Sequence, residues 1–186
     1  MPIHALTNTS DRILNQIITP VKITNIDTGE IVETYGLWDT GAQSCVIRHD
    51  LASYINLVPR GLKTIRGVQS QENRDYYYAN LKLNNEQISL DIEMTDVDPF
   101  TSDKRIGMLI GMDVITKGDF SISNFNGHTV MTFRKPSQGT IDYCAENALY
   151  NKYQKIHIEW LKHGNTMCPC HSGKKWDQCH GKIFED

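Results

Sequence analysis

Residues 36–47 read Gly36-Leu37-Trp38-Asp39-Thr40-Gly41-Ala42-Gln43-Ser44-Cys45-Val46-Ile47. A carboxylate, a hydroxyl and a glycine lie between two apolar runs, which predicts a strand, a tight loop and a second strand. In this loop Asp39 is the candidate acid or base. Gly41 leaves room for backbone N–H groups to approach the carboxylate, and the Thr40 hydroxyl can bind a neighbouring segment. Ala42 is small enough to leave space above Asp39.

The sequence Asp39-Thr40-Gly41-Ala42, with its apolar flanks, resembles the active-site loop of retropepsin-like aspartic proteases, the single-lobe relatives of pepsin. Residues 108–115, Met-Leu-Ile-Gly-Met-Asp-Val-Ile, are similar to the strand end and short helix that lie behind this loop in the family. The resemblance implies a mainly β, closed domain of the single pepsin-type lobe, here residues 1–137. It also implies that Asp39, Thr40 and Gly41 are catalytic.

The chain has a second Asp-Thr-Gly, at Asp27-Thr28-Gly29, but charged and polar residues flank it. We therefore interpret it as a hairpin turn, in which Asp and Gly are common. Asp27 lies only 12 residues before Asp39, too close for each to belong to its own lobe. The resemblance therefore implies a symmetric homodimer with Asp39 from each chain at the twofold axis.

In such a dimer two adjacent carboxylates share one proton. One activates water and the other polarises the scissile carbonyl, so activity is expected to depend on pH as a coupled pair. Peptides or proteins would be the substrates, and catalysis would need no cofactor. Two positions differ from the family pattern: Trp38 is expected to change the packing behind the loop, and Gln43 to change contacts at its rim.

Alternating and β-branched patterns predict about nine short strands and two short helices. Residues 64–70 and 76–83 form a predicted hairpin with a polar tip at residues 71–75, which matches the family's flap by position. Gly67 and Val68 of this hairpin, together with Ala42, are expected to contact substrate bound as an extended strand. The other predicted segments are strands at 13–23, 31–35, 87–94 and 106–111, helices at 49–55 and directly after Gly111, a loop at 95–104, and a hairpin of 120–125 and 128–133 around Asn126-Gly127.

A helical arm is expected at residues 138–164. Apolar residues recur at helical spacing between residues 140 and 162, and Gly164 follows as a stop signal. We expect this stripe to dock on the β domain or on a partner chain, with a dedicated partner-binding helix as the alternative. The stripe consists of Ile141, Ala145, Leu149, Tyr153, Ile156 and Trp160.

Residues 165–186 contain a candidate metal site of Cys168, Cys170, Cys179 and His180. Three thiols and an imidazole suit a tetrahedral zinc ion, and so short a segment would need the metal in order to fold. The spacing resembles the SEC-C motif, which implies one structural Zn²⁺ per chain. His171 stands where that motif usually has glycine, and we assign it no ligand role. A Cys168–Cys170 disulfide or idle thiols are the alternative.

By the same resemblance, the zinc tail is expected to bind a protein partner. Lys174, Lys175 and Trp176 are the candidate contact residues; the alternative is that they only pack and solvate the tail.

The composition sets limits on the function. The 186 residues carry a formal net charge of -3 and are 39% hydrophobic. Such a chain lacks the basic surface of a nucleic-acid-binding protein or a polybasic membrane-binding segment. The sequence shows no secretion signal and no apolar run near the roughly 18 residues of a membrane span. Five cysteines, three of them near the end, favour metal binding in a reducing compartment. The resemblances imply that this compartment is a bacterial-type cytoplasm.

Three functional hypotheses remain open on the sequence. The first is an active homodimeric aspartic endopeptidase, and the second is a non-catalytic adaptor that binds extended peptides with a protease-like dimer. The third makes the SEC-C segment the main functional part, with the β domain as scaffold. Cys45 is a conceivable nucleophile but has no obvious base, so we interpret it as a small buried hydrophobe; Cys144 is expected to pack.

Overall fold

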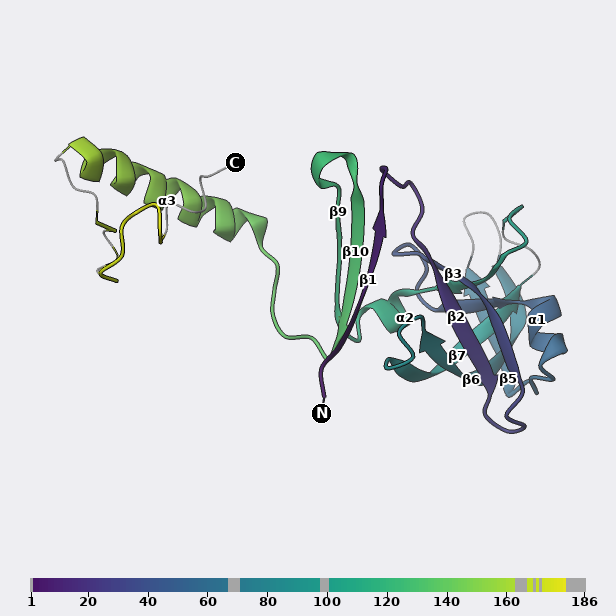
Figure 1. Cartoon of the computed structure of the whole chain (residues 1–186). Helices are drawn as coiled ribbons and strands as arrows, with labels where there is room; N and C mark the ends of the chain where they lie inside the picture. The colour runs from purple at the N-terminus through teal and green to yellow at the C-terminus, as the bar shows by residue number, and fades with distance from the viewer. Residues whose placement is uncertain are drawn as a thin grey trace. The chain divides into compact units, whose positions relative to one another are not determined.

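The computed structural model describes residues 2–66, 71–97, 101–162, 167–168, 170 and 172–179. The chain divides into two compact units, Met1–Gly139 and Thr140–Asp186, which are described separately. The first unit is built almost entirely from β-strands (Figure 1). Among the described helices, none is both long and apolar enough to cross a membrane.

A closed barrel forms the larger part of the first unit. β2 pairs with β3 on one side and with β6 on the other, so six strands close into a ring and β5 is added outside it on β6. The mainly β, closed fold expected from the sequence is therefore confirmed. In sheet order the strands are β2 (Ile18–Asn25), β3 (Ile31–Trp38), β8 (Ile106–Ile110), β4 (Cys45–Arg48), β7 (Ser89–Val97), β6 (Gln71–Leu83) and β5 (Gly61–Arg66).

Alternation along these strands fills the interior of the barrel. In β7 and β6, for example, every second residue over much of the strand points inward and is almost inaccessible to water, the pattern of a sheet with one face on the core. Two short helices, α1 (His49–Tyr54) and α2 (Met112–Ile115), lie where the sequence predicted them. The barrel interior includes Ile23, Ile47, Leu81, Leu83, Met94, Met108 and Ile110.

A separate antiparallel sheet of three strands stands beside the barrel (Figure 1). Its order is β1 (His4–Ser10), β10 (Thr129–Lys135) and β9 (Asp119–Ser123). The β9–β10 hairpin confirms the prediction made from Asn126-Gly127. Both residues have positive φ, 50° and 78°, as a tight hairpin turn requires, although the turn also includes a short 3₁₀ segment, η1 (Phe125–Gly127).

Trp38 joins the two sheets directly before Asp39. Its ring stacks on Phe120 of β9 with centroids 5.2 Å apart, and it packs at 5.3 Å against Phe133 of β10. The indole N–H donates a hydrogen bond of 2.9 Å to the buried hydroxyl of Thr19. Trp38 thus determines the packing behind the loop, as expected: its indole fills the space between the barrel and the three-stranded sheet.

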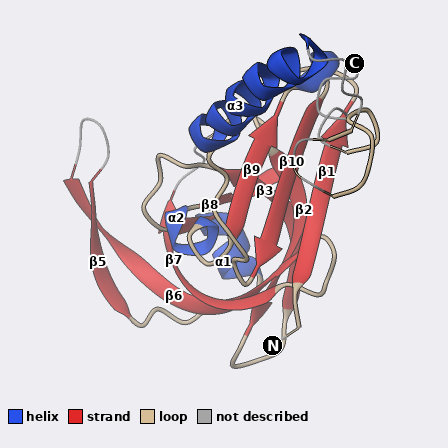
Figure 2. Cartoon of the chain, turned by 90° about the vertical axis from the view of Figure 1, so that its left-hand side faces the viewer, coloured by secondary structure: helices blue, strands red, loops and turns tan. Residues whose placement is uncertain are grey.

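The flap hairpin is present, but its strands differ from the prediction. β5 pairs with β6 from Gly61↔Tyr76 to Arg66↔Gln71, so the segment 71–75 predicted as the tip is part of a 13-residue strand. Polar residues are acceptable there because this end of β6 pairs only with β5 and projects away from the barrel (Figure 2). The predicted contact residues Gly67 and Val68 lie outside the described residues.

Two other boundaries were predicted wrongly and one strand was not predicted. The strand predicted at 13–23 begins only at Ile18, because residues 11–17 form an irregular connection tied to Thr129, which accepts a hydrogen bond from Leu14 N. β1 was missed entirely, since its alternation places only Leu6 in the core. The loop predicted at 95–104 begins later than expected, because β7 continues through Val97 in parallel pairing with β4.

The second Asp-Thr-Gly forms the β2–β3 turn, as predicted. Gly29 has φ 79° and donates its N–H to the Asn25 carbonyl at 2.8 Å. The Asp27 carboxylate accepts hydrogen bonds from Arg60 at 2.5 and 2.8 Å. This copy of the motif therefore has a structural role.

The second unit contains α3 (Tyr143–Lys162). Of the helices in the described residues, it is the only one longer than six residues. It begins later than the predicted residue 140 because Asp142 acts as its cap: the side chain accepts a hydrogen bond from Ala145 N at 3.0 Å. Ile141 and Leu149 of the predicted stripe are about half exposed, at 52% and 51%. The side chains of Tyr153, Ile156 and Trp160 lie outside the described residues.

The packing of Trp38 predicts a large loss of stability for Trp38→Ala. Removing a buried tryptophan costs about 3–5 kcal/mol, and the Thr19 hydroxyl would also lose its donor. The free energy of unfolding, measured by urea titration with far-UV circular dichroism, should fall by that amount. Phe125→Ala is the control, because Phe125 is 79% exposed and its loss should change stability by less than about 0.5 kcal/mol. Equal effects of the two substitutions would contradict this role of Trp38.

Candidate active site

Backbone hydrogen bonds hold the Asp39 loop at both ends. Asp39 N–H donates to the Ile110 carbonyl at 3.0 Å, which continues the parallel pairing of β3 with β8. At the other end, Met112 N–H donates to the Ala42 carbonyl at 2.8 Å and Asp113 N–H donates to the Gln43 carbonyl at 3.2 Å. The loop is thus tied to the junction between β8 and α2.

The Asp39 carboxylate lies directly beyond the end of β3 and is half-buried. Its Oδ1 accepts a hydrogen bond of 2.8 Å from Gly41 N–H, and the Ala42 N–H donates to the Asp39 carbonyl at 3.3 Å. The glycine thus provides the close backbone approach that the sequence suggested, and Thr40 at the turn is exposed. A carboxylate oriented in this way and open to water can exchange a proton with a bound molecule.

Gly111 allows α2 to lie close behind the loop. A Cβ at this position would come within 2.6 Å of the Ser44 carbonyl carbon and 2.7 Å of its oxygen, both backbone atoms that cannot move away cheaply. The apolar strand end, glycine and short helix noted in the sequence therefore lie against the segment that follows Asp39.

Asp113 is a site residue that sequence reasoning did not assign. Its Oδ2 accepts a hydrogen bond of 3.0 Å from Cys45 N–H, and its Oδ1 accepts one of 3.2 Å from the Cys45 thiol. A single acid in the otherwise apolar run around Gly111 was the available signal. Asp113 therefore fixes the start of β4 to α2.

Cys45 is fully buried. Burial, together with the adjacent Asp113 carboxylate, raises the pKa of the Cys45 thiol. A thiol that stays protonated in the interior is a poor nucleophile, which agrees with the interpretation of Cys45 as a packing residue.

An open groove of about 670 Å³ begins at Gly41 and Ala42, which follow Asp39 in the loop; Asp39 itself is not among the lining residues. A neighbouring hollow of about 460 Å³ shares Gln43, Ser44 and Lys63 with it, so the two form one trough between the loop and the β5–β6–β7 surface. Gln43 is exposed and lines both parts. The groove is lined by Gly41, Ala42, Gln43, Ser44, Val46, Lys63, Thr64, Ile65 and Thr95, and the hollow adds Asp91, Ile92, Glu93, Asp113 and Lys117.

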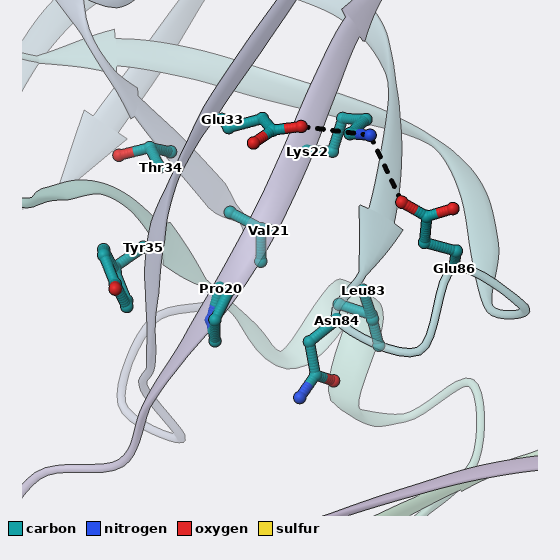
Figure 3. A pocket seen from close by; sticks show the side chains of 9 residues that line it. All are labelled: Pro20, Val21, Lys22, Glu33, Thr34, Tyr35, Leu83, Asn84 and Glu86. Carbon is teal, nitrogen blue, oxygen red and sulfur yellow. Dashed lines mark hydrogen bonds and ion pairs between the residues drawn. The ribbon is translucent and has the colours of Figure 1, made fainter.

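A further hollow of about 270 Å³ lies on β2 and β3, with the turn after β6 at its edge (Figure 3). Lys22 bridges Glu33 at 3.1 Å and Glu86 at 3.2 Å there. Its lining contains none of the predicted site residues: Pro20, Val21, Lys22, Glu33, Thr34, Tyr35, Leu83, Asn84 and Glu86.

A second cluster that the sequence did not indicate joins α1 to β6 and β7. His49 Nδ1 lies 2.5 Å from Oδ2 of the buried Asp96, and the Tyr77 hydroxyl donates to the same oxygen at 3.3 Å. Burial and the Asp96 charge raise the pKa of Tyr77 to about 12. These groups come from residues distant in sequence, and their contact holds α1 against the barrel wall.

In the second unit, the sulfur atoms of Cys168, Cys170 and Cys179 lie within 4.8 Å of one another. The Cys170 and Cys179 sulfurs are 3.6 Å apart, close to the edge of about 3.8 Å expected for thiolates on a tetrahedral ion with bonds of about 2.3 Å. Hydrogen bonds, first from Ser172 and then from Cys168, lower the pKa of Cys170 to about 6, which favours the thiolate form that binds metals. The cluster could therefore hold a metal ion.

The other residues predicted for the tail have mixed outcomes. Trp176 is 7% exposed, so it packs the module, whereas Lys174 and Lys175 are exposed. His180 and His171 lie outside the described residues. Cys144 is exposed on α3, contrary to the expectation that it packs.

Residues 165–182 match the SEC-C motif. The matched span includes the three clustered cysteines and also His180. A comparison with curated proteins gave no match to this chain.

Several of the solved structures similar to this chain are described as retropepsin-like or retroviral proteases. One is a retropepsin-like aspartic protease from Rickettsia conorii, 8% identical, covering 72% of this chain and 96% of its own, with a TM-score of 0.47. The EIAV protease is 15% identical, with coverages of 57% and 91% and a TM-score of 0.42. The retroviral protease-like domain of Ddi1 from Leishmania major is 14% identical, with coverages of 59% and 82% and a TM-score of 0.38. At these identities the likeness concerns the fold.

Proposed function

We propose that the chain is an aspartic endopeptidase that acts as a homodimer and hydrolyses peptide bonds. The observation that carries the proposal is the Asp39 loop: its half-buried carboxylate is held by Gly41 N–H at 2.8 Å, and Gly41 and Ala42 of the same loop line an open groove. An extended peptide in that groove would bring its backbone to the carboxylate.

The dimer follows from the number of carboxylates. Water-mediated peptide hydrolysis by this chemistry needs two acids that face one water, and each chain supplies one such loop. The other Asp-Thr-Gly is occupied by its ion pair with Arg60. A twofold axis beside Asp39 would bring the second carboxylate from an identical loop.

The proposed cycle uses one shared proton. One Asp39 carboxylate takes a proton from water while the protonated partner polarises the scissile carbonyl, and the two exchange roles for the leaving amine. Gly41 N–H stabilises the ionised form, and Thr40 contacts the opposite loop across the axis. Ala42, Gly67 and Val68 contact the substrate strand, and no metal or cofactor takes part in the chemistry.

The chain is proposed to have three functional segments. Residues 1–137 are the protease domain, 138–164 a helical arm, and 165–186 a tail that holds one structural zinc through Cys168, Cys170, Cys179 and His180. Thiolate and imidazole ligands that fill four positions leave none open for substrate. The tail would dock a protein partner, and the protein would act in a bacterial-type cytoplasm, without nucleic-acid or membrane partners.

A peptide-binding adaptor is the alternative function. The same groove supports it, since binding an extended strand requires no proton transfer. A third hypothesis, in which the SEC-C segment is the main functional part, is weaker because it assigns no function to the Asp39 loop.

Replacing the proposed base tests the enzyme against the adaptor. Asp39→Asn should lower the rate of cleavage of an unstructured protein mixture by about a thousand-fold or more, because the amide cannot accept the proton. New peptide termini are counted by mass spectrometry from mildly acidic to neutral pH. Asp27→Asn is the matched control and should cut at the wild-type positions. Equal cleavage by wild type and Asp39→Asn, with both folded and dimeric, would contradict the proposal and favour the adaptor.

The metal proposal predicts about one zinc per chain in elemental analysis of the purified protein. Cys170→Ser and Cys179→Ser should reduce that content strongly, because each removes a thiolate ligand. Cys144→Ser is the matched control and should retain the metal, since Cys144 is an exposed thiol on α3 that does not belong to the three-cysteine cluster.

Removing the zinc with a chelator should leave peptide cleavage unchanged. If cleavage is lost together with the zinc, a purely structural tail is contradicted. Unchanged zinc content in Cys179→Ser would contradict the ligand set.

A further inference from the structure

An ion pair crosses the sheet that borders the groove. Lys63 Nζ on β5 lies 2.5 Å from Glu93 Oε1 on β7, although β6 separates these two strands in the sheet. The contact therefore bridges from the projecting hairpin to the barrel wall. Their side chains are 46% and 33% exposed, so both charges are partly shielded from water.

The pair lies where the groove leads away from Asp39. The groove that begins at Gly41 is called the inner part of the trough, and the neighbouring hollow is called the outer part. Lys63 lines both parts, and Glu93 lines the outer part. Among the described residues that line the inner part, beside Gly41 and Ala42, Lys63 has the only charged side chain. A peptide that follows the loop past Gln43 and Ser44 would thus meet the ion pair with a side chain some residues from the scissile bond.

We propose that the Lys63–Glu93 ion pair lets the outer part of the groove accept substrate side chains of either charge, and that loss of one partner gives this part a charge preference. This inference rests on the proposed function, because it concerns the same groove. While the two charges are joined, each offsets the attraction of the other for a charged substrate group, so the pair favours neither sign. If one partner is removed, the remaining charge attracts a substrate side chain of the opposite sign and repels one of the same sign.

The outer part contains three other charged groups, which are the same in the wild type and in variants of Lys63 or Glu93. Asp91 accepts a hydrogen bond from Asn80 at 2.8 Å, Asp113 is held by Cys45, and Lys117 is exposed. They stay the same when only Lys63 or Glu93 is changed. Any shift in charge preference between variants therefore reports on the pair.

The test uses peptides derived from a sequence that the wild-type protein cuts or, if it cuts none, from a sequence that it binds in a fluorescence anisotropy screen. Each position is replaced in turn by Lys, Glu or Gln, and kcat/KM is measured for every peptide. At a position that reaches the pair, Glu93→Gln should raise the Glu-over-Lys ratio about three- to ten-fold relative to wild type, the size expected for a half-exposed charge contact. Lys63→Met should shift the ratio by a similar factor in the opposite direction.

The charge-swapped double variant Lys63→Glu with Glu93→Lys should return the ratio to within about two-fold of wild type, since the joined charges are restored. Glu33→Gln is the matched control. It breaks an ion pair with Lys22 on the hollow away from the groove (Figure 3), and it should leave the ratio unchanged.

The same peptides are also bound to the full chain carrying Asp39→Asn, with fluorescence anisotropy as readout, so that selection is measured without cleavage. Shifts of the ratio in binding support the inference even if no peptide is cut, in which case the enzyme proposal alone fails. Cleavage without any shift in Glu93→Gln and Lys63→Met overturns the inference and leaves the enzyme proposal standing. A shift of equal size in Glu33→Gln would also overturn it, since the effect would then be one of net charge.

Discussion

Hydrogen bonds between the Asp39 loop and the β8–α2 junction are the constraint on which the site depends. Ile110 fixes the backbone where Asp39 begins, and Met112 fixes it again at Ala42. The approach is possible only because Gly111 leaves no side chain against Ser44. Between these anchors the chain has little freedom, so the Asp39 carboxylate is held in place by segments more than 60 residues away in the sequence. This arrangement keeps an acid oriented without burying it completely.

The rest of the first unit serves to hold that loop and to form a wall opposite it. The β2–β6 pairing closes the barrel, and Trp38 ties the strand that enters the loop to β9 and β10. β6 is long enough to pair with β2 at one end and with β5 at the other. The projecting hairpin and the loop therefore belong to one continuous sheet, and Lys63 and Glu93 meet across it. Positioning of the acid and selection of substrate would thus depend on the same strands.

Turns and loops whose conformation depends on neighbouring residues were predicted from the sequence. Asn126-Gly127 marked the β9–β10 turn because a tight hairpin needs positive φ, and the apolar flanks separated the Asp39 loop from the Asp27 turn. Long-range contacts were not predictable in this way. β1 has only one core residue, Leu6, so its sequence showed no clear strand pattern. Residues 71–75, which were predicted as the flap tip, belong to β6 because they pair with β5. Asp113 contacts Cys45 only because β8 and β4 are neighbours. The same holds for His49 and Asp96, whose contact no local pattern announces.

The central claim is that two copies of Asp39 form one catalytic site, and subunit mixing tests it most directly. Wild-type and Asp39→Asn chains are mixed at fixed total concentration under conditions that allow exchange, and peptide cleavage is measured. If each site needs both carboxylates, an equal mixture keeps about a quarter of the all-wild-type activity, because about a quarter of randomly formed dimers carry both. Activity of about half, proportional to the wild-type fraction, would show that each chain acts alone and would contradict the account.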